Sequence, residues 1–457
     1  MEQKTQSAPQ TGGSSKLETI PMAKLLMTMS APMMLSFFIQ ALYNMVDSIF
    51  VARISENALT AVSLAMPMQN VITAVGVGLG VGLSALLPRA MGAGDGKHAD
   101  RLMNTDLFLG IVVWAVLFFL GLFAAAPYFA LQTDVAEIAV DGTIYLRICW
   151  MASIGALCGQ VLEKALVASG HAFSAMSSQA AGAVFNIVFD PLLIFGIGIF
   201  PRMGIAGAAA ATVLGQILGA AVALGFNLKY NRQIHIGRHL FRPDWKAAGQ
   251  IFSVGFPSMI TIGLSAAMSF LVNQVLLAYS TTAAAVYGIW LKLQNFCFMP
   301  AFGMNNGLVP ILSYNYARKN RERVRTAMRM SFTFIAILMA VLTLLFEFIP
   351  DQLLTLFSAS ENMLAIGRIA IRICVLSLFF GGINVVGATA MQAMDHPGYT
   401  LVINLCRQFI LIVMLFYALS AIFHQLNLLW TAIPIGEAVT LAIMAVLFRK
   451  TMRTLDR

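Results

Sequence analysis

Long apolar runs recur through the whole chain and leave few folds open to it. Examples lie at residues 107–127, 331–349 and 409–423. A helix needs about 20 apolar residues to cross roughly 30 Å of hydrocarbon, and these runs approach or reach that length. Only 11% of the residues are charged and 59% are apolar, which is too little charge to cover a soluble protein of this size. We therefore expect an all-α polytopic membrane protein that has the lipid bilayer as a partner.

Polar loops divide the chain into twelve predicted transmembrane helices, of which the fourth, residues 136–168, is among the longest. If the N-terminus is inside, most of the 29 Lys and Arg residues fall in inner segments. Positive charge concentrates on the cytoplasmic side of membrane proteins. We therefore expect both termini in the cytoplasm and the protein in the plasma (inner) membrane. Because this topology accounts for the basic loops, no nucleic-acid partner is expected.

The chain contains an internal repeat. A single constant offset along the chain aligns Pro32 with Pro257, and it also aligns Gly78 and Gly82 with Gly303 and Gly307. One offset that serves several separated helices indicates a duplication. Each unit holds six spans, an even number, so the two six-helix lobes should form a parallel repeat with a pseudo-two-fold axis along the membrane normal. The repeated glycines are expected to allow close helix packing.

These observations predict a domain order with two cytoplasmic tails, two lobes and a linker, in a protein that acts as a monomer. The predicted parts are a flexible cytoplasmic tail (1–22), an N-terminal lobe (23–228), a basic cytoplasmic linker (229–247), a C-terminal lobe (248–450) and a cytoplasmic tail (451–457).

The first predicted helix carries a polar stripe on an otherwise apolar surface. Ser36, Gln40, Tyr43, Asn44 and Asp47 follow one another at spacings of four, three, one and three residues. Residues three and four apart lie on the same face of a helix. These residues therefore form one polar stripe, and Asp47 lies near the outer end of the helix.

The fifth predicted helix carries a second membrane-embedded acid. Asn186 and Asp190 are four residues apart, and Thr212 of the sixth helix is predicted at the same depth. At the offset of the internal repeat, Asp190 corresponds to Leu415 in the second lobe and Asp47 corresponds to Val272. The acid pair thus belongs to the first lobe alone.

Two acids at this depth require a compensating partner or a function. An acid at the bilayer centre costs about 2.5–3.5 kcal/mol on insertion scales. Burial and mutual repulsion favour uptake of a proton, and oxygen ligands from Asp47, Asp190, Asn186 and Thr212 would also suit a Na⁺ ion. A structural alternative is that the acids pair with Arg147 or Lys164 and hold the lobe together. No cofactor is expected beyond the coupling ion.

Two further features bear on mechanism. Pro32 removes a hydrogen bond from the first helix and is expected to form a hinge. In the second lobe, Glu437 occupies the repeat position of Thr212, and Arg407 is also deep in the membrane. They form either a structural ion pair or a second site for an ion or substrate.

Several segments resemble the multidrug and toxic compound extrusion family. They are "APMMLSFFIQALYNMVDSIFVARI", "AMPMQN", "RAMGAGDGKHA", "ASGH", "FNIVFDPLLIFG" and "GIAGAAAAT". The resemblance covers nearly the whole chain and implies twelve helices in two lobes that exchange a drug or metabolite against Na⁺ or H⁺. It assigns cation coupling to Asp47 and Asp190, with the nearby Asn186 and Thr212, and bending of the first helix to Pro32. Some relatives place coupling acids in the seventh and tenth helices, where this sequence has only one acid, at an outer edge.

The leading hypothesis is a secondary exporter of cationic, amphipathic compounds rather than an enzyme. The predicted cation-coupling residues are Gln40, Tyr43, Asn44, Asp47, Asn186, Asp190 and Thr212. Export of an endogenous metabolite is one alternative. Another is a flippase for lipid-linked oligosaccharides, which would use cations such as Lys292, Arg372 and Arg407 to hold a pyrophosphate. A remote alternative is an intramembrane aspartyl protease, because "GAGD" at 92–95 resembles its signature, although neighbouring glycines favour a turn there.

Overall fold

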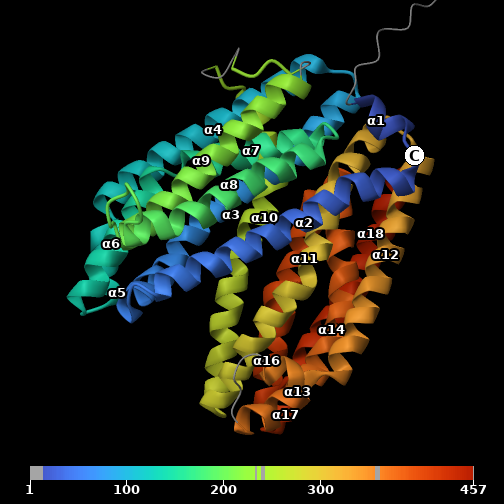
Figure 1. The fold of residues 1–457 in the computed structure, drawn as a ribbon. Helices are drawn as coiled ribbons and strands as arrows, with labels where there is room; N and C mark the ends of the chain where they lie inside the picture. The colour runs from blue at the N-terminus through green and yellow to red at the C-terminus, as the bar shows by residue number, and fades with distance from the viewer. Residues whose placement is uncertain (1–13, 232–233, 238–241, 356–360, 456–457) are drawn as a thin grey trace, which may run out of the picture.

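The computed structural model describes residues 14–231, 234–237, 242–355 and 361–455, and within these ranges every regular element is helical (Figure 1). The elements are α1 (Ser14–Thr19), α2 (Met22–Ala52), α3 (Glu56–Gly92), α4 (Gly96–Phe123), α5 (Ala125–Gln132), α6 (Ala136–Met151), α7 (Ile154–Ala168), α8 (Ala172–Phe195), α9 (Ile205–Tyr230), α10 (Trp245–Leu277), α11 (Thr281–Ala317), α12 (Arg321–Phe348), α13 (Pro350–Thr355), α14 (Glu361–Ala393), α15 (Pro397–Leu405), the π-helix η1 (Cys406–Ile410), α16 (Leu411–Phe423), α17 (Leu426–Leu429) and α18 (Ala432–Leu455).

The helices confirm the predicted all-α polytopic membrane fold. Within the described residues, ten helical spans are long and apolar enough to cross a bilayer by themselves. The fourth predicted helix is instead the pair α6 and α7, which is bent by 44°. Counted as one span, this pair brings the number of spans to eleven. The twelfth long helix is α11, which has 37 residues, the same length as α3.

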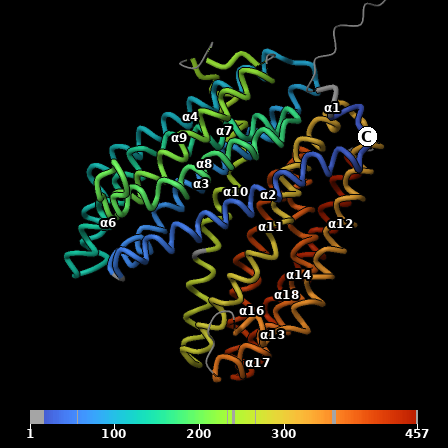
Figure 2. Tube along the Cα trace, viewed as in Figure 1, coloured from blue at the N-terminus to red at the C-terminus, as the bar shows by residue number. Residues whose placement is uncertain are grey.

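The helices form two bundles that meet at one end. Figure 1 shows α3–α9 in one bundle and α11–α18 in the other, close together near α1 and the C-terminus and diverging toward α5 and α17. We call the end with α1 and the segment between α9 and α10 the linker end. The tube in Figure 2 shows α2 running from the linker end of the second bundle to the far end of the first. Accordingly, α2 packs against both α8 and α11, and α10 packs against both α3 and α15.

The repeated glycines lie where the two lobes touch, which confirms their predicted role in close packing. A Cβ atom on Gly82 would lie 2.6 Å from the carbonyl oxygen of Ile251 in α10. A Cβ atom on Gly303 would lie 2.5 Å from Cα of Met34 in α2. Both distances are below any normal contact, so only glycine permits this approach of the backbones.

Polar contacts also join the lobes at the linker end. Arg89 of α3 donates to Oδ1 of Asp395 at 2.5 Å and to the carbonyl oxygen of Ala393 at 3.0 Å. The hydroxyl of Ser30 donates to the carbonyl oxygen of Met304 at 3.4 Å. These contacts connect the first half of the chain to the second and hold the linker end together.

Residues 14–19 differ from the expected flexible tail, because they form α1 and pack against the second lobe. Leu17 is fully buried, and Arg323 donates to the carbonyl oxygens of Leu17 and Ile20 at 3.1 and 2.9 Å. Arg318 adds an ion pair to Glu18 at 3.1 Å. A single apolar residue in a polar segment is a weak sequence signal, so this docking was not predicted. The remainder of the predicted tail, positions 1–13, lies outside the described residues.

Candidate cation and cargo cavity

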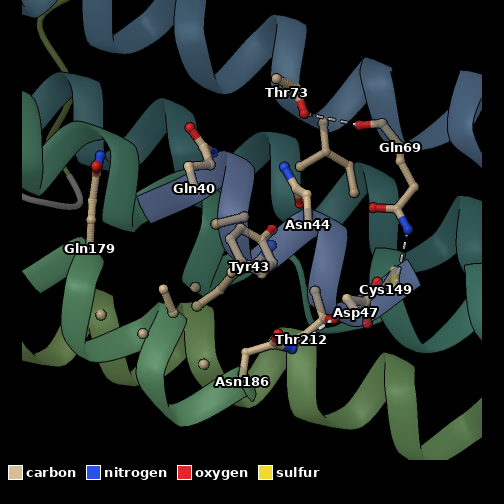
Figure 3. A pocket seen from close by; sticks show the side chains of 18 of the residues that line it. Gln40, Tyr43, Asn44, Asp47, Gln69, Thr73, Cys149, Gln179, Asn186 and Thr212 are labelled. Carbon is tan, nitrogen blue, oxygen red and sulfur yellow. Dashed lines mark hydrogen bonds between the residues drawn. The ribbon is translucent and has the colours of Figure 1, made fainter. Parts of the chain in front are cut away.

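The first lobe encloses a cavity of about 520 Å³. Its wall combines α2, α3, α6, α7, α8 and α9 (Figure 3). Amide and hydroxyl groups dominate the polar part of the wall, which contains Ser36, Gln40, Asn44, Ser48, Ser63, Gln69, Asn70, Thr73, Gln160, Ser178, Gln179, Asn186, Thr212 and Gln216. Asp47 and Glu163 are the acids of this lining, which includes no Lys or Arg among the described residues.

Small residues leave this space open in the first lobe. Gly155, Gly159 and Gly182 all line the cavity, and a Cβ atom on Gly182 would lie 2.7 Å from the carbonyl oxygen of Gly215. Helices α8 and α9 therefore pack backbone against backbone while projecting few side chains inward. At the offset of the internal repeat, the three glycines correspond to Phe380, Asn384 and Arg407.

In the second lobe two of these larger residues, Asn384 and Arg407, contribute to a buried ion pair. Nε of Arg407 donates to Oε1 of Glu437 at 2.6 Å, and the amide of Asn384 donates to Oε2 at 2.9 Å. The guanidinium also lies 5.0 Å from the ring centroid of Phe298. Both partners of the pair are buried, at 8% and 2% exposure. This geometry favours the structural alternative for Glu437 and Arg407.

The structure brings together the polar residues predicted on the fifth and sixth helices. The amide of Asn186 donates to Oδ1 of Asp190 at 3.2 Å and to the hydroxyl of Thr212 at 3.3 Å. Asp190 is fully buried, and Asn186 and Thr212 line the cavity in front of it. The i, i+4 spacing of Asn186 and Asp190 thus gives the shared face that was expected.

Asp47 of α2 completes this cluster, and the side chains of Gln40, Tyr43 and Asn44 lie farther along the same cavity wall (Figure 3). Asp47 and Asp190 lie close enough for their carboxyl groups to interact electrostatically. Two ionised carboxylates at short range repel each other, and a proton or a small cation between them relieves this repulsion.

The cluster also has free oxygen ligands. Among the described residues, Oδ1 of Asp47, Oδ2 of Asp190 and Oδ1 of Asn186 are buried without a hydrogen-bond partner. Buried polar atoms are normally satisfied. Unpaired carboxylate and amide oxygens at one point suit a hard monovalent cation such as Na⁺ as well as a proton.

The three helices place the cluster at a common depth. Asp47 is five residues before the end of α2, Asp190 is five residues before the end of α8, and Thr212 is seven residues after the start of α9. At 1.5 Å per residue, all three lie roughly 8–11 Å from the helix ends away from the linker.

Glu163 of α7, for which the sequence predicts no role, also lines the cavity. Its Oε2 accepts a hydrogen bond of 2.5 Å from the amide of Gln179, and it is 9% exposed. Gly155, Gly159 and Glu163 are spaced four residues apart and so share one face of α7. That spacing was the available signal, but it does not show which face of the helix meets a cavity.

The basic residues named in the structural alternative do not compensate the acid pair. Lys164 donates to Asn306 of the second lobe, and Nε of Arg147 is buried without a hydrogen-bond partner among the described residues. Among the described residues, neither of these basic groups therefore pairs with Asp47 or Asp190.

The two-lobed helical fold and its acid-bearing cavity define a polytopic membrane transporter. The chain belongs to the MatE family, whose model matches residues 32–192 and 257–418. There is one match in each half of the chain, in agreement with the internal repeat.

Curated relatives and solved structures agree with this assignment. The chain is 26% identical over 427 residues to the "FAD transporter" of Shewanella oneidensis, covering 92% of both chains. It is 22% identical over 432 residues to "Multidrug export protein MepA" of Staphylococcus aureus, covering 94% of both. A structure described as the outward-facing conformation of a multidrug resistance MATE family transporter has a TM-score of 0.90 at 24% identity, covering 98% of this chain and all of the other.

Proposed function

We propose that the protein exports cationic, amphipathic compounds by antiport against Na⁺ or H⁺. The cluster of Asp47, Asp190, Asn186 and Thr212 carries the proposal, because it gathers two acids and unpaired carboxylate and amide oxygens beside a cavity. The cavity that they border is about 520 Å³ in volume and is lined by amides, hydroxyls and acids. Such a wall attracts a positively charged organic molecule and repels an anionic one.

The orientation follows from the distribution of positive charge. The linker end, with most of the basic residues, faces the cytoplasm, and both termini lie on that side. The two bundles therefore diverge toward the outside (Figure 1). In this arrangement an ion enters from outside and reaches Asp47 and Asp190, and the cargo leaves in the opposite direction, to the outside.

Ion binding and cargo binding then oppose each other through α2. This helix continues through Pro32, contributes Asp47 to the ion pair and lines the cavity with Gln40, Tyr43 and Asn44. When Asp47 and Asp190 take up the ion, bending near Pro32 narrows the cavity and releases the cargo. Exchange of one monovalent cation for another moves no net charge, so each tenfold ion gradient supplies about 1.4 kcal/mol.

The other transport hypotheses fit the cavity less well. A flippase for a pyrophosphate-linked sugar needs cations at its site, and the lining has none among the residues that the structure describes. The same argument weighs against a dinucleotide cargo, although one relative is named an FAD transporter. Asp95, the acid of the protease hypothesis, instead caps α4 by accepting from the N–H of His98 at 3.0 Å.

Efflux from proteoliposomes tests the proposal. Wild-type protein is expected to export a fluorescent cation when a Na⁺ or pH gradient is imposed, whereas Asp47→Asn and Asp190→Asn should not respond to the gradient. Asp106→Asn is the matched control, since Asp106 is a fully buried acid of the same lobe outside the cavity. Undiminished gradient-driven efflux in both site variants would refute the coupling role, and export of FAD in place of the cation would refute the cargo class.

A further inference from the structure

The segment between the lobes is bound to one face of α4. The amide of Asn104 donates to the carbonyl oxygen of His235 at 2.9 Å, and its Oδ1 accepts from the N–H of Gly237 at 2.6 Å. The N–H of Asp244 donates to the hydroxyl of Thr105 at 3.1 Å. These contacts bury Asn104 and Thr105 almost completely. In the first lobe, this face of the helix is therefore covered by the chain itself.

Asp100 provides the charged contact of the same face. Its Oδ2 lies 3.0 Å from Nδ1 of His235, and its Oδ1 accepts from the N–H of that residue at 2.8 Å. The face of α4 is thus acidic at this point, and the segment that covers it presents a basic group.

The duplicated face lies on α12 of the second lobe. The offset of the internal repeat carries Asp100 to Arg325 and Asn104 to Arg329. Instead of being covered, this face forms an open groove lined by Thr326, Arg329, Met330, Thr333 and Phe334. Their side chains follow an i, i+3, i+4, i+7 pattern on one side of the helix.

The groove differs from its counterpart in charge. Arg329 is exposed and has no ion-pair partner among the residues that the structure describes. Where the first lobe has Asp100 and Asn104, the second lobe has two arginines. A molecule complementary in charge to this groove is therefore an anion.

The depth of Arg329 identifies where that anion comes from. Arg329 is eight residues after the first residue of α12, roughly 12 Å from its linker end. The ring centroids of Phe332 and Phe448 are 5.5 Å apart, so the end of α18, with the exposed Arg449 and Lys450, lies beside the same region. An unpaired arginine at the bilayer surface, flanked by further basic residues, matches the phosphate level of a leaflet.

We infer that the groove of Thr326, Arg329, Met330, Thr333 and Phe334 binds the head group of an anionic phospholipid of the cytoplasmic leaflet. The guanidinium of Arg329 and the hydroxyls of Thr326 and Thr333 hold the phosphate, and Met330 and Phe334 contact the acyl chains. This lipid occupies in the second lobe the place that the interlobe segment occupies in the first. The inference does not depend on the transported cargo.

Native mass spectrometry of the full chain tests the site with two probes, phosphatidylglycerol and phosphatidylcholine with identical acyl chains. The wild type is expected to retain phosphatidylglycerol in preference to phosphatidylcholine. Arg329→Gln should weaken phosphatidylglycerol binding roughly fivefold, the factor expected for one basic residue at an anionic surface. Lys97→Gln is the matched control, because it removes one exposed positive charge at the linker end of α4.

Each other outcome overturns the inference. Equal retention of the two lipids, or no retention of either by the wild type, would exclude a site for anionic lipid. Equal losses in Arg329→Gln and Lys97→Gln would show that only net charge matters. Displacement of phosphatidylglycerol by millimolar inorganic phosphate would show recognition of phosphate without the lipid.

Discussion

Removing the charge of Glu437 is expected to destabilise the second lobe strongly. In Glu437→Gln the shape of the side chain is kept, but the guanidinium of Arg407, 8% exposed, loses its counter-ion 2.6 Å away. Breaking a buried ion pair by neutralising one partner costs about 3–5 kcal/mol, because the other charge stays buried and uncompensated. Transport should be lost only to the extent that folded protein is lost.

The double variant separates structure from function. Replacing both Arg407 by Met and Glu437 by Leu removes both charges from this buried site. The free energy of unfolding should then return to within about 1 kcal/mol of the wild type or exceed it. Thermal unfolding in detergent measures both variants. A loss of about 3 kcal/mol lowers the midpoint by on the order of 6–12 °C in a domain of 150–250 residues.

Two results would refute this reasoning. A midpoint of Glu437→Gln within about 2 °C of the wild type would show that the charge pair contributes little. A stable double variant without gradient-driven transport would show that Glu437 or Arg407 acts in the transport cycle.

Three other substitutions test separate parts of the structure. Gly255→Ala should lower the unfolding midpoint, because the new Cβ atom would collide with the carbonyl oxygen of Gly78 at a cost of about 1–3 kcal/mol. Gly263→Ala on the same helix is the control, since a Cβ atom there meets no other atom and should leave the midpoint unchanged. Burial opposes ionisation of Asp244, but hydrogen bonds from two backbone N–H groups of α10 and the nearby Arg101 lower its pKa below the ordinary value of 3.8. The ionised carboxylate therefore stabilises the fold above pH 3.8, and this stability is lost as the pH falls through the lowered pKa. The unfolding midpoint of Asp244→Asn should accordingly decrease less at acidic pH than that of the wild type. Glu163→Gln should weaken binding of a cationic dye by about tenfold, the loss expected for one charge-assisted contact, while the dependence of that binding on the coupling ion remains.

Much of the cation cluster followed from the sequence because local rules govern it. Spacing fixes the shared face of Asn186 and Asp190, and the order of spans fixes the depth at which Thr212 and Asp47 approach them. The internal repeat added that the second lobe lacks these acids. Those arguments need only the helical period and the order of the helices along the chain, and the structure confirms both.

What escaped prediction depends on lateral packing between helices. No periodicity shows that Glu163 faces a cavity. The pairing of Arg407 with Glu437 across 30 residues of sequence could be predicted only as one of two alternatives. Likewise, the 44° break between α6 and α7 falls at Ala152 and Ser153, where the sequence has no proline to indicate a bend. Which neighbour a helical face meets is decided by the whole bundle, so these features emerge only from the assembled structure.

The most direct test of ion coupling is the affinity of the purified protein for a cationic dye, measured over a range of Na⁺ concentrations and over a range of pH. If cargo and ion compete through Asp47 and Asp190, each tenfold rise in the coupling ion should weaken dye binding up to tenfold, since the coupling between two ligands is reciprocal. Asp106→Asn should keep this dependence, and Asp47→Asn and Asp190→Asn should show none. Dye affinity that stays equally dependent on the ion in both site variants would contradict the account.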